Sequence, residues 1–153
     1  MTMLDRPEFQ EALRYVFEEK ILFCRALSLK FRIVRGRPEV SFAKQDFMLG
    51  NTKLGVLHGG VTAAVLDSIA GVAVLLKMAA QDPKPDIGTQ LREFGRLSTI
   101  DLRVDYLEPA AADRFVATAT VTRVANVQMA LHDDKGQCVA TGAAAFSLRA
   151  ARG

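Results

Sequence analysis

The sequence predicts an α+β fold in which a curved antiparallel sheet wraps around one long central helix. Three observations lead to this prediction. Apolar residues near the start recur at helical spacing, a second helix is apolar on nearly every side, and segments with a two-residue period lie before and after it. At 153 residues the chain suits a single domain over 1–153 with one sizeable core.

The first element expected is an amphipathic helix over about 5–23. Asp5 and Glu8 have the spacing of a capping pair, and Pro7 suits a first helical turn. The apolar positions that recur at helical spacing are Phe9, Leu13, Val16, Phe17 and Ile21.

A β-hairpin should follow this helix. From Ala26 the apolar period becomes two, and "GRP" at 36–38 interrupts the chain before the apolar-polar alternation of "EVSFA" at 39–43. The alternating apolar residues of the first strand are Leu27, Leu29, Phe31 and Ile33.

The central helix is expected over about 60–80, after a loop that ends at His58, Gly59 and Gly60. Because it is apolar on almost all sides, it should be buried around most of its circumference. Its longest apolar run, 61–76, contains polar residues and is shorter than the roughly 20 residues that cross a bilayer. We therefore expect a core helix and not a membrane span.

After the helix, the stretch "QDPKPDIGTQLREFG" at 81–95 is rich in Pro, Gly and charge, which predicts a mobile surface connection that could cover a site. Four strands should follow at 97–107, 114–124, within 125–136, and at 137–148. One face of the first of them should carry Ile100, Leu102, Val104 and Tyr106. A small sheet with one helix leaves an edge and a face to cover, which favours at least a homodimer.

Composition excludes several classes of function. The formal charge is only +3, from 20 basic and 17 acidic residues. The basic residues also form no stripe along the sequence that would suit nucleic acid. Cys24 and Cys138 stand far apart without metal-ligand spacing, so neither a disulfide framework nor a metal site is expected. The first residues lack the apolar stretch of a signal peptide, so we expect a cytoplasmic protein without a membrane partner.

The residue of greatest chemical interest is Asp67, in the middle of the apolar helix. Burying an unpartnered carboxylate is expensive, so Asp67 should face a polar partner, a cleft or a subunit boundary; the alternative is that it faces solvent or a structural Arg. About two helical turns before it, roughly 10 Å, Gly59 and Gly60 stand where the helix has unpaired N–H groups and a positive dipole end. Such a turn can polarise a carbonyl oxygen.

The segments "GVLHGGVTAAVLDSIAGVA" and "STIDLRVDYLEPA" resemble the hot-dog fold thioesterases of the phenylacetic-acid-degradation type, related to the acyl-CoA thioesterase 13 group. The resemblance extends from about residue 50 to 148. It implies a hot-dog fold, in which the long helix lies inside the curved sheet, and active sites at the interface of a homodimer, commonly within a dimer of dimers. It also implies that Asp67 is the catalytic carboxylate, as general base or nucleophile, and that the Gly59 N–H polarises the thioester carbonyl.

The resemblance suggests further site residues. Thr99 stands where relatives often have a catalytic hydroxyl, although an ordinary strand Thr is the alternative. His58 corresponds to the loop histidine that shapes the turn, and Gly60 and Ser68 are substrate-binding candidates beside the two catalytic positions. Relatives commonly carry an Asn six residues before that histidine; here Thr52 occupies the position and Asn51 precedes it, so Asn51 reaches the site only through a shifted loop. The stretch 122–134 is also shorter than in relatives, so no coenzyme A contact is assigned there.

Together these features predict an acyl-CoA thioesterase that hydrolyses its substrate to a free carboxylic acid and coenzyme A. No cofactor is expected, since coenzyme A is part of the substrate. The alternative is a non-catalytic acyl-CoA or acyl-carrier binding protein of the same fold. A hot-dog dehydratase would pair its acid with a histidine across the interface, a pattern that His58 and His132 do not match. Acyl-chain specificity is not predicted.

Overall fold

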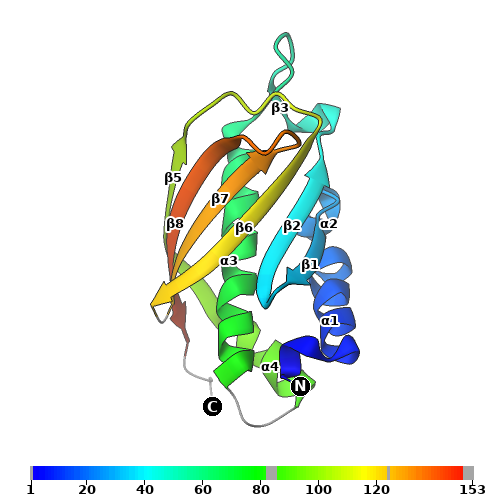
Figure 1. The fold of residues 1–153 in the computed structure, drawn as a ribbon, viewed down its shortest axis with the longest axis vertical. Helices are drawn as coiled ribbons and strands as arrows, with labels where there is room; N and C mark the ends of the chain where they lie inside the picture. Colours follow the sequence, from blue (N-terminus) through cyan, green and yellow to red (C-terminus); the bar gives the residue numbers. More distant parts are fainter. Residues whose placement is uncertain (1, 82–85, 124, 150–153) are drawn as a thin grey trace.

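The protein forms a six-stranded antiparallel sheet that curves around the long helix α3, as Figure 1 shows. This computed structural model describes residues 2–81, 86–123 and 125–149. The strand order across the sheet is β1-β2-β6-β7-β8-β5. The strands are β1 Lys30–Val34, β2 Arg37–Ala43, β5 Leu97–Tyr106, β6 Arg114–Arg123, β7 Asn126–Asp133 and β8 Cys138–Leu148. The α+β class and the helix-in-sheet arrangement predicted from the sequence are confirmed.

Helix α3 spans Gly59–Gln81 and forms the centre of the core. By length and composition alone, this 23-residue helix could cross a membrane, since an 18-residue stretch within it has a mean hydropathy of 1.9. The sheet packs around it instead, and its side chains at Val65, Leu66, Ile69 and Leu75 are fully buried. The apolar surface of this helix is therefore buried by other parts of the protein on most sides.

The N-terminal segment differs from the single helix predicted over about 5–23. After a 3-10 turn (η1, Met3–Asp5), helix α1 covers Pro7–Arg14, a wider π-helical turn (η2) covers Tyr15–Lys20, and α2 covers Leu22–Ala26. The Asp5 carboxylate caps η1 through Thr2, with bonds of 2.9 and 2.8 Å, and not the predicted helix.

Tertiary contacts account for the widened turn. The Phe31 N–H of β1 donates to the Glu18 carboxylate at 2.8 Å, and the Phe17 ring packs on Phe31 and Phe94 at centroid distances of 5.0 and 4.7 Å. Single-turn π segments relax a helix where such side chains must reach their partners.

The predicted hairpin is present as β1 and β2, but the first strand begins at Lys30 and not near residue 27. Arg35 and Gly36 form the connection, both with positive φ (51° and 75°), which matches the right-handed twist of the flanking strands. Pro38 is tolerated within β2 because pairing with β6 begins only at Glu39.

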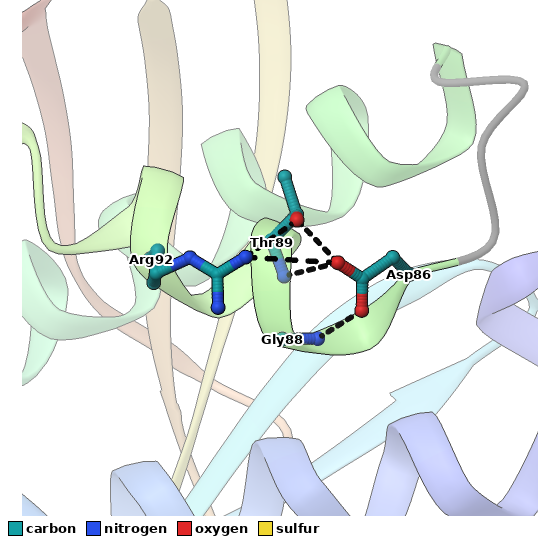
Figure 2. A network of polar contacts seen from close by, with 4 residues as sticks. All are labelled: Asp86, Gly88, Thr89 and Arg92. Carbon is teal, nitrogen blue, oxygen red and sulfur yellow. Dashed lines mark hydrogen bonds and ion pairs between the residues drawn. The ribbon is translucent and has the colours of Figure 1, made fainter.

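The connection expected over 81–95 is in part a helix, which corrects the prediction of a surface loop. Residues 82–85 lie outside the described part, and α4 covers Ile87–Phe94. Figure 2 shows its N-cap: the Asp86 carboxylate accepts from the N–H groups of Gly88 (3.1 Å) and Thr89 (3.2 Å) and from the Thr89 hydroxyl. The helix packs beside the C-terminal end of α3, away from the Gly59 end (Figure 1).

Strand β5 contains a β-bulge that changes which side chains face α3. Thr99 pairs with Phe146 and Asp101 with Ala145, so Ile100 is the extra residue. The bulge shifts the two-residue alternation by one position. As a result Ile100, predicted to share the inner face, is 66% exposed, and Thr99 lies on the α3 side with Leu102, Val104 and Tyr106.

Two shorter elements complete the fold. β3 (Leu49–Asn51) and β4 (Val56–Leu57) form a small hairpin that projects at the Gly59 end of α3 (Figure 1). At the opposite end, β6 and β7 pair as far as Arg123 and Asn126, which leaves only residues 124 and 125 between them.

Candidate active site

Asp67 lies half-buried on α3, facing the edge strand β5. The Thr99 hydroxyl donates a hydrogen bond of 2.9 Å to its Oδ1 atom. This contact exists because the bulge at Ile100 turns Thr99 toward the helix. A hydroxyl that donates to one carboxylate oxygen fixes the orientation of the group and leaves the other oxygen available to accept a proton or to attack.

Gly59 begins α3, and two side chains define its surroundings. The Tyr106 hydroxyl donates to the Gly59 carbonyl at 2.7 Å, and the His58 Nδ1 atom accepts the Gly60 N–H at 2.9 Å. The Val61 N–H bonds to the His58 carbonyl at 2.9 Å. Among the described residues the Gly59 N–H has no acceptor. This N–H can therefore donate a hydrogen bond to a ligand oxygen.

Both glycines are constrained by close contacts. A Cβ atom on Gly59 would lie 3.1 Å from the Tyr106 hydroxyl oxygen and 3.2 Å from the ring carbon Cζ. A Cβ atom on Gly60 would lie 2.9 Å from the His58 Nδ1 atom. A larger residue at either position would therefore displace the Tyr106 or the His58 side chain.

A cavity of about 460 Å³ opens beside Gly59. Asn51, Leu54, Tyr106 and Glu108 lie among its lining residues, together with apolar side chains of β4, β8 and the loop after β5. The Asn51 Oδ1 atom accepts the Leu54 N–H at 3.0 Å, which closes the β3–β4 turn at the cavity. Asn51 therefore does reach the Gly59 end of the helix.

The predicted site residues fall into two groups within one protomer. Asp67 and Thr99 form one, and Gly59 with Gly60, His58 and Asn51 forms the other. Eight residues of helix separate Gly59 from Asp67, about 12 Å of rise and about 80° around the axis. A single small ligand cannot touch both groups in one protomer.

Comparison with known proteins identifies the family. The profile of the thioesterase superfamily matches residues 54–139. The chain belongs to the thioesterase superfamily. The predicted resemblance to a thioesterase is thereby confirmed at the level of the superfamily.

Among the relatives of this thioesterase are the medium/long-chain acyl-CoA thioesterases YigI of Salmonella typhimurium and Escherichia coli K12. The first is 32% identical over 147 residues and the second 31%, and each alignment covers 91% of this chain and 95% of the relative. A solved structure from Shewanella oneidensis, related to the thioesterase superfamily, has 29% identity and a TM-score of 0.85, with 93% of this chain and 96% of that chain covered. A thioesterase of Haemophilus influenzae, at 17% identity, a TM-score of 0.70 and coverages of 90% and 88%, shares the fold.

Ser68 of the thioesterase, a predicted substrate-binding residue, bonds to its own helix and to α2. Its hydroxyl donates to the Ala64 carbonyl at 2.8 Å and accepts a weak bond of 3.6 Å from the Cys24 thiol. Burial raises the pKa of that thiol, which keeps it protonated. The three groups tie α3 to α2, a structural role for this serine.

Two residues that line the cavity beside Gly59 were not among the predicted site residues. Tyr106 was expected on the inner face of its strand but not in the site, and Leu54 was not singled out. The position of Tyr106 in "STIDLRVDYLEPA", one of the two segments with family resemblance, was the available signal. Within the described residues, no three His, Cys, Asp or Glu side chains gather as metal ligands would.

Proposed function

We propose that the protein is an acyl-CoA thioesterase that releases a free carboxylic acid and coenzyme A. The observation that carries the proposal is the hydrogen bond from Thr99 to Asp67, which presents an oriented carboxylate on the core helix. The YigI relatives, whose alignments cover 91% of this chain, are named medium/long-chain acyl-CoA thioesterases, which supports an acyl-CoA substrate.

Asp67 supplies the chemistry in this proposal. As a general base it takes a proton from water while the water oxygen adds to the thioester carbonyl carbon. Negative charge then develops on the carbonyl oxygen, where the Gly59 N–H donates a hydrogen bond that strengthens in the transition state. The C–S bond breaks as the carbonyl re-forms, and the thiolate of coenzyme A leaves and takes up a proton. As a nucleophile, Asp67 would itself add to the carbonyl and expel the thiolate, and water would then cleave the resulting anhydride.

The other predicted residues support these two. Thr99 orients the carboxylate, and His58 fixes the first turn of α3 by accepting the Gly60 N–H. Asn51, which lies at the cavity beside Gly59, is proposed to contact substrate.

The separation of Asp67 from Gly59 calls for a second protomer. Within residues 2–81, 86–123 and 125–149, β5 is an edge strand of the sheet and pairs only with β8. An exposed strand edge offers unpaired backbone groups for association with another copy. We propose a homodimer in which the edge regions of two protomers meet, so that Asp67 of one protomer faces Gly59 of its partner. A dimer of dimers, membership of the phenylacetic-acid-degradation subgroup and a cytoplasmic setting belong to the same proposal.

Release of free thiol from a panel of aryl- and aliphatic acyl-CoAs tests the proposal. The wild-type protein should turn over at least one substrate, and Asp67→Ala should abolish the activity while keeping the fold, checked by circular dichroism. Equal rates for wild type and Asp67→Ala across the panel would reject an enzymatic role for Asp67. Tight binding of an acyl-CoA by wild type without any turnover would favour the alternative, a non-catalytic binding protein.

A further inference from the structure

The cavity beside Gly59 has a buried apolar floor. Leu57, Ala110, Val139 and Ala140 form most of this floor and are at most 8% exposed. The backbone groups of the floor are already paired: the Leu57 N–H bonds to the Ala110 carbonyl at 3.0 Å, and the Leu107 and Glu108 N–H groups bond to the Val139 carbonyl at 3.0 and 3.2 Å. The floor therefore offers apolar contact and few free hydrogen-bonding groups.

Two of the polar side chains at the cavity already make hydrogen bonds within the protein, and a third is unsuited to the phosphates of coenzyme A. The Tyr106 hydroxyl is committed to the Gly59 carbonyl, and the Asn51 Oδ1 atom to the Leu54 N–H. The described residues that line the cavity include one acid, Glu108, and neither lysine nor arginine. A carboxylate at the cavity repels the phosphates of coenzyme A.

Two parts of the substrate extend from the thioester group: the pantetheine part of coenzyme A and the acyl chain. The cavity beside Gly59 suits only one of them. The pantetheine part carries amides that would lose their hydrogen bonds on an apolar floor, at a cost of about 1–3 kcal/mol for each unsatisfied group. An acyl chain has no such groups and gains from burial. We infer that the acyl chain of the substrate lies in this cavity, with coenzyme A leaving in the opposite direction. The inference rests on the proposed function and names the specificity surface of that site.

Two exposed leucines form the rim that a longer chain would contact. Leu54, at the β3–β4 turn, is 67% exposed, and Leu107, just after β5, is 53% exposed. Exposed leucines of this kind contribute little stability to the free protein. Contact with an acyl chain would remove their apolar surface from water and so favour binding. Short acyl chains would remain on the floor, and longer ones would reach the rim.

The test compares kcat/KM for butyryl-, octanoyl- and palmitoyl-CoA in wild type, Leu54→Glu and Leu107→Glu. Each variant should lower the value for palmitoyl-CoA about tenfold or more, since it removes roughly one leucine of apolar contact. The value for butyryl-CoA should change by less than about twofold, as for an ordinary surface substitution. Since every substrate carries the same coenzyme A, the butyryl value also shows any general effect of the added charge.

Leu22→Glu provides the matched control, because Leu22 is 72% exposed on α2 and does not line the cavity. It should leave the chain-length profile unchanged. An unchanged profile in both rim variants, or an equal loss for all three substrates, would overturn the placement of the acyl chain while the thioesterase function stands. Failure of wild type to hydrolyse any acyl-CoA would instead overturn the proposed function, and this inference with it.

Discussion

The Tyr106 hydroxyl donates a 2.7 Å hydrogen bond to the Gly59 carbonyl, and its ring lies against the Gly59 Cα. The bond joins the end of β5 to the first residue of α3. Because the N–H of the same residue is the proposed oxyanion donor, this contact anchors the residue that carries the donor. Rigid support of this kind matters, since a displacement of about 1 Å in a catalytic group can cost about 100-fold in rate.

Substitution of Gly59 by alanine should therefore lower kcat. The added Cβ would lie 3.1–3.3 Å from the Tyr106 side chain, so the helix start or the ring must move. We expect a loss of about tenfold or more in kcat/KM for an acyl-CoA, measured by thiol release, because the donor is displaced although it is not removed. Tyr106→Phe, which removes only the hydroxyl, should cost less, and Tyr106→Ala should partly restore Gly59→Ala by making room. Full activity of Gly59→Ala would show that catalysis does not depend on the exact position of the Gly59 N–H.

Thr99 should act through its hydroxyl. Thr99→Val keeps the shape of the side chain but removes the donor to Asp67, and a hydrogen bond to a charged group is worth about 1.5–3 kcal/mol. We expect kcat/KM to fall about tenfold to 100-fold, with conservative rescue by Thr99→Ser. Steady-state kinetics on the three proteins provides the measurement. Equal activity of the valine and threonine forms would mean that Asp67 needs no such support.

A site shared between protomers predicts complementation. Asp67→Asn and Gly59→Val should each be inactive alone, whereas a mixed dimer contains one site with an intact Asp67 and an intact Gly59. With random mixing about half of the dimers are mixed, so co-expressed and co-purified proteins should regain about a quarter of wild-type activity. Differently tagged chains allow the mixed dimers to be isolated. No recovery in isolated mixed dimers would show that both groups act within one protomer.

The Asp86 cap should make the stability of α4 depend on pH. Bonds from the Thr89 hydroxyl and from the N–H groups of Gly88 and Thr89, together with the Arg92 guanidinium at 3.7 Å, hold the pKa of this carboxyl below its usual value (Figure 2). A lowered folded pKa means that the stabilisation is present above the unfolded pKa, near 4, and is lost as pH falls through the folded value.

We expect Asp86→Ala to unfold at lower urea concentration than wild type at neutral pH, because it lacks the N-cap. The difference between the two proteins should shrink as the pH of unfolding is lowered from the unfolded pKa through the lower folded pKa, where the wild-type carboxyl becomes protonated. Asp86→Asn keeps a capping oxygen and should show a smaller deficit at neutral pH. A deficit of Asp86→Ala that is independent of pH would exclude a contribution from the carboxylate charge.

Several elements could be predicted because their signals are local. The uniformly apolar character of 60–80 indicated a core helix, alternation indicated the strands of β6 to β8, and the paired glycines marked the helix start. Two predictions about helical segments were wrong, one where distant contacts reshape the helix and one where the N-cap of α4 was not recognised. The segment 5–23 has a π-helical turn where Phe17 and Glu18 meet β1, and part of 81–95 is helical because α4 is capped by Asp86 and packs on α3.

The sequence by itself determined the residues of the candidate site and their order along α3, since helical rise alone separates Gly59 from Asp67. Only the tertiary structure decided which side chains meet them. One extra residue, Ile100, inverts the alternation of β5, and this brings Thr99 to Asp67. A bulge of this kind depends on pairing with β8, a strand that lies about forty residues further along the chain, so no local pattern encodes it.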